Sequence, residues 1–162
     1  LRAKHLLRRC LFHYNNDLLA ETSDLGAVDA VDQLLLDNTI TYNEPYDPLP
    51  DEDPHGYWLS SGIYPPEIPN QARKRGLLSA WWWYNMINRV NLKDKLTFFL
   101  HTTFTIASGD VGASHYFYDH LKLIEHYSLG NLRELAKKIT LDNAMLNYLD
   151  NTQNNANNPN EN

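Results

Sequence analysis

Hydrophobic residues recur at helical spacing along most of the chain, and they are densest between Gln71 and Ala107. This stretch predicts two helices in series, separated by a break at Val90–Asn91. Both patterns are more apolar than a helix with a single buried face requires, so other segments are expected to cover these helices on more than one side. We therefore predict that the rest of the chain is organised around this helix pair.

Shorter amphipathic patterns flank the pair and predict further helices. Several begin after a side chain that can accept a hydrogen bond from the exposed amides of a helix start. The predicted helices and caps are 2–12, followed by a turn capped by Asn15 or Asn16; 25–36 after Asp24; 115–129 between Ser114 and Gly130; 132–139 after a capping box at Asn131 and Glu134; and 141–149 after Thr140. Because no segment alternates convincingly with period two, the predicted fold is all-α, an irregular bundle of six or seven helices.

Residues 37–70 interrupt these patterns. Seven of the eight prolines lie between Pro45 and Pro69, interleaved with aromatic residues. Since proline lacks an amide donor and disfavours helix at the residue before it, this segment is predicted to be a long irregular loop. Its aromatic content favours a loop that packs against the helical body and wraps it. We predict one helical domain over 1–150, with this loop as an insertion, and an asparagine-rich polar segment over 151–162.

Composition narrows the function. The net charge of −6 argues against wholesale binding of nucleic acid, which depends on neutralising phosphates. No apolar run approaches the roughly 18 residues that a membrane-spanning helix needs, so no membrane span is expected. Cys10 is the only cysteine, which excludes an intramolecular disulfide and a four-cysteine zinc site. These features predict no cofactor.

Two histidine positions are candidates for chemistry. His101 lies in an apolar helix, where it is either a buried base or ligand, or a core histidine bonded to a backbone carbonyl or an acid. His115 and Asp119 are four residues apart on one predicted helix face, a spacing that can place two ligands on one metal ion. The alternative for this second pair is an ordinary solvated charge pattern. In both cases we prefer the structural interpretation.

Acidic residues gather in the proline-rich loop, where Asp51 and Asp53 are the candidate ligands for a structural calcium ion. Calcium binds several carboxylate or carbonyl oxygens, and this loop concentrates carboxylates. However, it lacks the glycine turn of an EF-hand. A solvated acidic loop is therefore the preferred interpretation, with calcium as the alternative.

Tryptophan content raises the alternative of a sugar-stacking platform, built from Trp58 and the run Trp81–Trp83. Three consecutive helical residues point about 100° apart, so they cannot make one flat surface. We predict that these rings pack in the core and against the loop.

Several short motifs occur in an order that identifies a family. They are His5-Leu6-Leu7-Arg8-Arg9 followed by Phe12; a tryptophan-rich helix; the segment His101-Thr102-Thr103-Phe104; a Leu-Gly helix end; the run Asn143-Ala144-Met145-Leu146, which continues to Asn151; and Pro159-Asn160-Glu161-Asn162. This order resembles the bacterial domain-of-unknown-function family 1800, over the whole chain except the proline-rich loop. The family often shows His-Asn-His-Phe around the position of His101. The second imidazole is missing here, which argues against a metal chelated by a histidine pair at this segment.

The resemblance implies a mostly helical protein that is exported to the periplasm or the cell exterior. It also implies a gene neighbour that encodes a sulfatase-like companion, whereas the family's biochemical activity is not established. In the family the Pro159–Asn162 run continues into another helix, so the chain is expected to be the N-terminal part of a longer domain. Processing at Asn162, truncation and incomplete tracing are the alternatives for this end.

In that context Asn160, Glu161 and Asn162 are candidate binding residues that cap the next helix or bridge to it. Glu161 is also a candidate catalytic acid, although structural capping is preferred. The function we expect is a structural or interaction role, with the rest of the same protein or another chain as partner. The alternative is a hydrolase or metal-dependent enzyme that acts on extracellular polymers, with a site completed by residues beyond Asn162.

Overall fold

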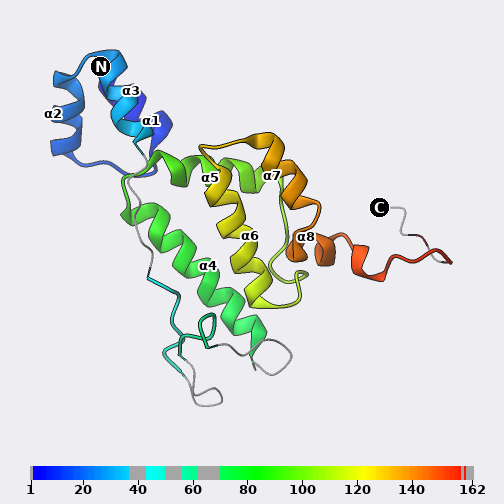
Figure 1. Ribbon diagram of the computed structural model, residues 1–162. Helices are drawn as coiled ribbons and strands as arrows, with labels where there is room; N and C mark the ends of the chain where they lie inside the picture. Colours follow the sequence, from blue (N-terminus) through cyan, green and yellow to red (C-terminus); the bar gives the residue numbers. More distant parts are fainter. Residues whose placement is uncertain (1, 37–42, 50–55, 62–69, 158, 160–162) are drawn as a thin grey trace.

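The computed structural model describes residues 2–36, 43–49, 56–61, 70–157 and 159. Figure 1 shows its helices, which are α1 (Arg2–Cys10), α2 (Asn16–Asp24), α3 (Ala27–Leu35), α4 (Gln71–Asn88), α5 (Leu92–Thr103), α6 (Ser114–Tyr127), α7 (Leu132–Ile139), α8 (Asn143–Tyr148) and the 3₁₀ helix η1 (Asn151–Gln153). The described residues contain no strand, which confirms the all-α prediction. The prediction of six or seven helices omitted α2, which Asn15 caps by accepting a hydrogen bond from the Leu18 amide at 2.9 Å.

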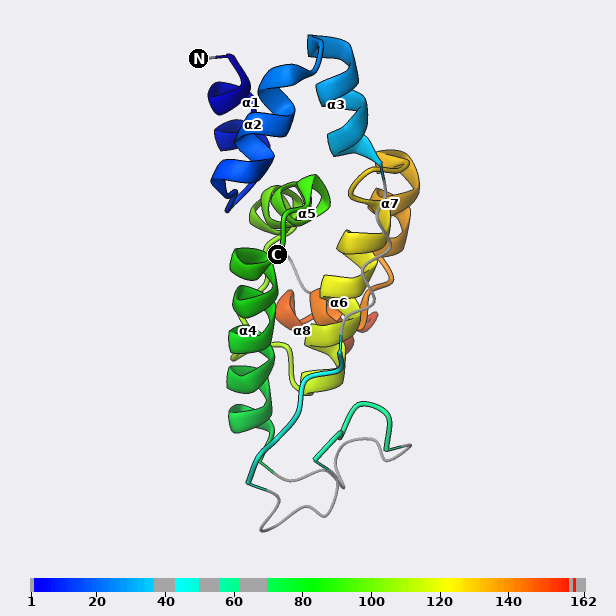
Figure 2. The same ribbon diagram turned by 90° about the vertical axis from the view of Figure 1, so that its left-hand side faces the viewer.

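The central helix is α6. It packs against α4, α5, α7 and α8, and Figure 2 shows it between α4 and α7. Its residues Phe117 and Leu121 join one cluster of the hydrophobic core, shared with α4 and α8. Ile124 joins a second cluster, shared with α7. The prediction that α4 and α5 organise the chain was therefore wrong, because the many polar residues of α6 conceal how much of this helix is buried.

Other predicted boundaries are confirmed. The break between the two apolar helices lies at the expected place, because α4 ends at Asn88 and Asn91 caps α5. Asn131 caps α7 by accepting hydrogen bonds from the Arg133 and Glu134 amides. These caps follow from the Asx side chain, which satisfies amides that have no partner inside the helix.

Two predicted caps are wrong. Ser114 is the first residue of α6, and its hydroxyl accepts a hydrogen bond from Trp58 Nε1 at 3.0 Å. The cap of α8 is Asp142, whose carboxylate accepts from the Met145 amide at 3.0 Å, whereas Thr140 lies at the end of α7. A carboxylate also interacts favourably with the positive end of the helix dipole, which a threonine hydroxyl does not match.

Helices α1 to α3 form a lobe at one end of the molecule, which we call the N-terminal lobe (residues 2–36) (Figures 1 and 2). Within it α1 packs on α2, and Leu7 and Leu11 are buried. The lobe meets the body at Phe12, whose ring stands edge-on to Phe98 of α5 at a centroid distance of 5.6 Å. This aromatic contact joins the lobe to the first core cluster.

The described parts of the proline-rich segment, residues 43–49 and 56–61, are anchored to α4 by a buried ion pair. Asp47 is 1% exposed and accepts hydrogen bonds from Arg73 at 2.8 Å and from Lys74 at 3.3 Å. Burial acts to raise the pKa of Asp47, but the hydrogen bonds and the two positive charges lower it below its ordinary value. Lys74 is fully buried, with its ammonium 5.2 Å from the centroid of the Trp58 ring. The wrapping course of the whole 37–70 loop stays a prediction, because much of it lies outside the described residues.

The four tryptophans occupy different environments. Trp58 and Trp82 are buried, and Trp81 donates a hydrogen bond from Nε1 to the Asn43 carbonyl at 2.6 Å. Trp83 is 49% exposed. The indoles of Trp81, Trp82 and Trp83 thus face the loop, the core and solvent, respectively, and their divergence follows from the 100° spacing. The prediction that all of these rings are packed is wrong for Trp83.

The buried ion pair gives a stability prediction. Replacing Asp47 by alanine leaves the Lys74 ammonium buried without its carboxylate, so the free energy of unfolding should fall by about 3–5 kcal/mol in urea denaturation. The double variant D47A/K74M should recover much of this loss, because the buried ammonium is removed together with its carboxylate. As a control, E134A breaks the exposed Glu134–Lys137 pair and should cost less than about 1 kcal/mol. A D47A variant as stable as E134A would contradict the assignment.

Candidate functional site

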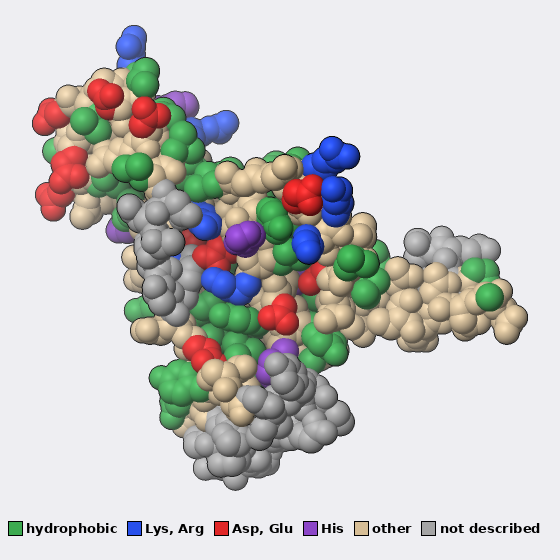
Figure 3. All heavy atoms as spheres, viewed as in Figure 1, with side chains coloured by type: hydrophobic (Ala, Val, Ile, Leu, Met, Phe, Trp, Pro, Cys, Tyr) green, Lys and Arg blue, Asp and Glu red, His purple; other side chains and the backbone are tan. Residues whose placement is uncertain are grey.

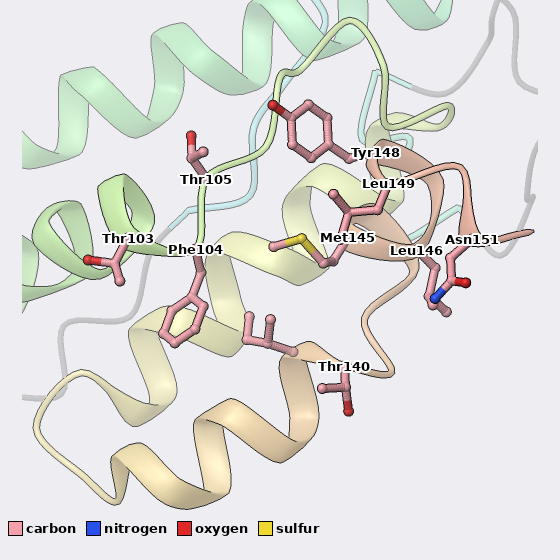
Figure 4. A pocket seen from close by; sticks show the side chains of 10 residues that line it. Thr103, Phe104, Thr105, Thr140, Met145, Leu146, Tyr148, Leu149 and Asn151 are labelled. Carbon is pink, nitrogen blue, oxygen red and sulfur yellow. The ribbon is translucent and has the colours of Figure 1, made fainter. Parts of the chain in front are cut away.

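The candidate site is a pocket between the end of α5, the end of α7 and α8 (Figure 4). Its volume is about 480 Å³, within the range of natural ligand pockets. The floor is apolar and consists of Phe104, Ile139, Met145, Leu146 and Leu149. The polar lining residues are Thr103, Thr105, Thr140, Tyr148 and Asn151. We call this cavity the α5–α8 pocket.

Beside this pocket, His120 of α6 connects the elements that form its walls. The ring is fully buried, with Nε2 3.2 Å from the Phe104 carbonyl oxygen and Nδ1 2.8 Å from Asp142 Oδ2. Phe104 is the residue that ends α5, and Asp142 is the cap of α8. A single side chain of the central helix therefore ties together two walls of the pocket.

The partners of His120 determine where its protons lie. A carbonyl oxygen can only accept, so Nε2 carries a hydrogen and donates it to Phe104. Nδ1 faces a carboxylate at 2.8 Å, and this contact is favourable only with a second proton between the two atoms. The geometry thus assigns a buried histidine–carboxylate hydrogen bond. Asp142 Oδ2 also accepts from the Met145 amide, which couples this pair to the start of α8.

His101, which the sequence analysis named as a candidate for chemistry, packs against the His120 ring. Its ring meets Trp82 edge-on at 4.9 Å and His120 at 5.6 Å between centroids. Burial and the neighbouring charge of His120 lower the pKa of His101 to about 4, so this imidazole is neutral at pH 7. Its Nδ1 is buried and has no hydrogen-bond partner in the described part of the chain. A chemical role for His101 stays a prediction.

A second buried charged group lies at the corner between α4 and α5. Arg89 donates a hydrogen bond to Asp94 at 2.6 Å, and Asp94 is 3% exposed. Burial raises the pKa of Asp94 to about 6, although the charge of Arg89 opposes this rise, and Glu125 of α6 adds to it. Glu125 in turn pairs with Lys122. Each of these carboxylates therefore has a cationic partner within its own part of the structure, and between the two parts the charge of Glu125 also acts on Arg89, where it opposes the lowering of the pKa by burial.

Of the predicted metal ligands, only His115 and Asp119 lie in the described part of the chain. His115 is buried at the start of α6, where burial lowers its pKa, whereas Asp119 lies one turn further along the helix. Over residues 2–36, 43–49, 56–61, 70–157 and 159, no group of three histidine, cysteine or acidic side chains could hold a metal ion. The other candidates lie outside the described residues and stay predictions: Asp51, Asp53, Asn160, Glu161 and Asn162.

Sequence reasoning missed the His120–Asp142 pair and the pocket beside it. The two residues are 22 positions apart, and nothing in a single sequence indicates that they meet. A weaker signal was present at Asp142, because an acid three residues before Met145 fits an N-cap better than Thr140 does. Recognising it would have placed the carboxylate, but not its histidine partner.

The arrangement defines an all-α domain with a pocket at the edge of its core. A family model described as "Protein of unknown function (DUF1800)" matches residues 5–162, and the chain belongs to this family. Searches of curated proteins and of solved structures found no match to the chain. None of the described helices combines the length and the hydrophobicity that a membrane crossing requires.

His101 and Asp94 make opposite contributions to the pH dependence of stability. The pKa of His101 falls from 6.5 to about 4 on folding, so its contribution to stability is lost as the pH falls from 6.5 towards 4. The pKa of Asp94 rises from 3.8 to about 6, so its contribution is present at low pH and is lost as the pH rises towards 6. Between pH 4 and 6 the two effects partly cancel.

Single variants should separate these two contributions. Relative to the unmodified chain, H101F should gain stability as the pH falls from 6.5 to 4.5, and D94N should lose it. Each difference is limited to about 1.4 kcal/mol per pH unit for one proton. Urea denaturation at pH 4.5, 5.5 and 6.5 measures both differences. If the stability of both variants changes with pH in the same way as that of the unmodified chain, neither group titrates as described.

Proposed function

We propose that this chain is an interaction module of an exported bacterial protein, and that the α5–α8 pocket binds apolar side chains of a partner polypeptide. The observation that carries the proposal is an open pocket of about 480 Å³ with an apolar floor, next to exposed leucines. Leu149 lines the pocket and is 43% exposed, and Leu141, adjacent to the lining residue Thr140, is 75% exposed. A partner that covers these side chains removes apolar surface from water.

The chemistry of the lining supports a polypeptide partner. Burying a leucine or phenylalanine side chain contributes about 1.5–3 kcal/mol, and the floor offers apolar contacts to such a side chain. The hydroxyl and amide groups around it, from Thr103, Thr105 and Asn151, can pair with the backbone of the same segment. An apolar floor with a few polar groups is the usual composition of a binding pocket.

The proposed partner and compartment follow from what the resemblance to the family implies. We propose that the occupant is a segment of the same protein after Asn162 or a segment of another chain. Among other chains, the sulfatase-like companion implied by the family is the first to test. The proposed location is the periplasm or the cell exterior.

The alternative function is a hydrolase or metal-dependent enzyme acting on extracellular polymers, and the His120–Asp142 pair is the observation that favours it. A histidine oriented by a carboxylate is the base of many hydrolases. Here, however, the ring is fully buried and its second nitrogen is held by the Phe104 carbonyl. Because a carbonyl oxygen can only accept, the nitrogen that faces it carries a hydrogen and has no lone pair with which to take a proton from a substrate. For this reason we favour an interaction role.

The chain offers an internal probe of binding, because it has only two methionines. Met145 lines the pocket, whereas Met86 is fully buried in the core. In NMR titrations with N-acetyl-leucine amide and N-acetyl-phenylalanine amide, the labelled methyl group of Met145 should shift, and that of Met86 should not. L149N should weaken this binding about tenfold, which corresponds to losing about 1.4 kcal/mol of apolar contact.

The matched control is L132N, because Leu132 is an exposed leucine of α7 that does not line the pocket. This variant should bind both amides like the unmodified chain. Equal shifts at both methionines, or shifts that L149N leaves unchanged, would contradict a specific pocket. The enzyme would be supported instead if the full-length protein degrades an extracellular polymer and the H120Q variant loses this activity while it keeps its fold.

A further inference from the structure

The N-terminal lobe has a groove of its own, distant from the α5–α8 pocket. Its volume is about 630 Å³, and it lies between α1 and α3. The walls contain Leu6 of α1 and Val31 of α3, and four small residues of the groove let a backbone approach closely: Ala3, Gly26, Ala27 and Ala30. Small residues at a helix contact reduce the distance at which two helices can pack. The shape thus suits an additional helix.

An exposed apolar stripe on α3 continues this groove outwards. Val28, Val31 and Leu35 lie within about 60° of one another around the helix axis, because successive residues are about 100° apart. They are 72%, 40% and 47% exposed. Isolated surface leucines need no explanation, but a stripe at the spacing i, i+3, i+7 beside a groove is the pattern of a helix-binding surface.

The two rims of this surface carry opposite charges. Asp32 and Asp29 lie beside the stripe, on the side of α3 away from the groove, at about 40° and 100° from Val28 around the helix axis. On the other side, Arg2 lines the groove, and Arg9 shares its face of α1 two turns later. The segment 14–36, which contains α2 and α3, has five acidic residues and no basic one. Figure 3 shows acidic and hydrophobic side chains intermingled on the outer face of the lobe, with basic ones at its margins.

We propose that this groove binds an amphipathic helix of a partner protein, with lysine or arginine along the flank that faces Asp29 and Asp32. The opposite flank of the partner carries acidic residues that face Arg2 and Arg9, and its apolar stripe covers Val28, Val31 and Leu35. The bound helix completes a four-helix arrangement with α1, α2 and α3. Charge on the rims sets its orientation, because exposed charges contribute more to specificity than to affinity.

A second copy of this chain does not fit as the occupant. Its basic helix α1 already uses its apolar residues inside the lobe, where Leu7 is fully buried. A second α3 would place the acidic residues of the two copies against each other. The favoured occupant is therefore a different polypeptide, and this inference is independent of the α5–α8 pocket.

Three synthetic 16-residue peptides test the proposal by fluorescence anisotropy. All share one leucine stripe, and they differ in their flanks: basic on one side and acidic on the other, uncharged glutamine on both sides, or acidic on both sides. The first should bind at least tenfold more tightly than the other two. Its affinity should fall when salt rises from 0.05 to 0.5 M, because salt screens exposed charges. Equal binding of the three peptides would overturn the proposal.

Charge reversal on the chain supplies the decisive comparison. D29K/D32K should lose at least tenfold in affinity for the first peptide and gain affinity for the peptide with acidic flanks on both sides. A27W should abolish binding of every peptide by filling the groove, and I87N, at an exposed apolar residue of α4, should change nothing. Circular dichroism verifies that each variant is folded.

Two further results would overturn the proposal. One is concentration-dependent self-association in sedimentation that D29K/D32K abolishes, which would make a second copy the occupant. The other is binding to phosphatidylglycerol vesicles that A27W prevents, which would make the surface a membrane contact.

Discussion

The buried contact between His120 and Asp142 holds together three segments that are distant in sequence. The imidazole contacts the carboxylate that caps α8 through one ring nitrogen and the carbonyl that ends α5 through the other. Both side chains are buried, so neither can exchange its partner for water without opening the structure. The α5–α8 pocket exists because these helix ends are held at a fixed separation from α6. Removing either group leaves a buried donor or acceptor unsatisfied, which costs more than the hydrogen bond contributes.

The polar residues of α6 explain how one helix can be both central and hydrophilic. Ser114 receives the indole N–H of Trp58, and His120 connects α5 with α8. On the same helix, Phe117 and Leu121 supply ordinary hydrophobic packing. The helix thus anchors loops and helix ends with its polar groups while its apolar residues build two core clusters. A buried network of this kind specifies which segments meet, because only one arrangement satisfies every member.

The sequence was sufficient for much of the fold and for little of the candidate site. Helical periodicity located most helices, and asparagine at positions 91 and 131 marked two helix starts correctly. Helix α2 was missed because its apolar residues are few and because it contains Thr22 and Ser23, which favour a helix interior less than alanine or leucine does. In the structure both hydroxyls donate to carbonyls four residues earlier, within the helix. The His120–Asp142 pair was beyond sequence reasoning, because long-range contacts leave no local pattern.

The position of Met145 has a consequence for oxidative chemistry. Its thioether lines an open pocket, while Met86 is enclosed in the core, so peroxide reaches the first sulfur and not the second. The resulting sulfoxide is polar and would place a strong acceptor in a floor that otherwise consists of hydrocarbon. Occupancy of the pocket would protect this sulfur, so the extent of sulfoxidation records whether the pocket was filled when the oxidant arrived.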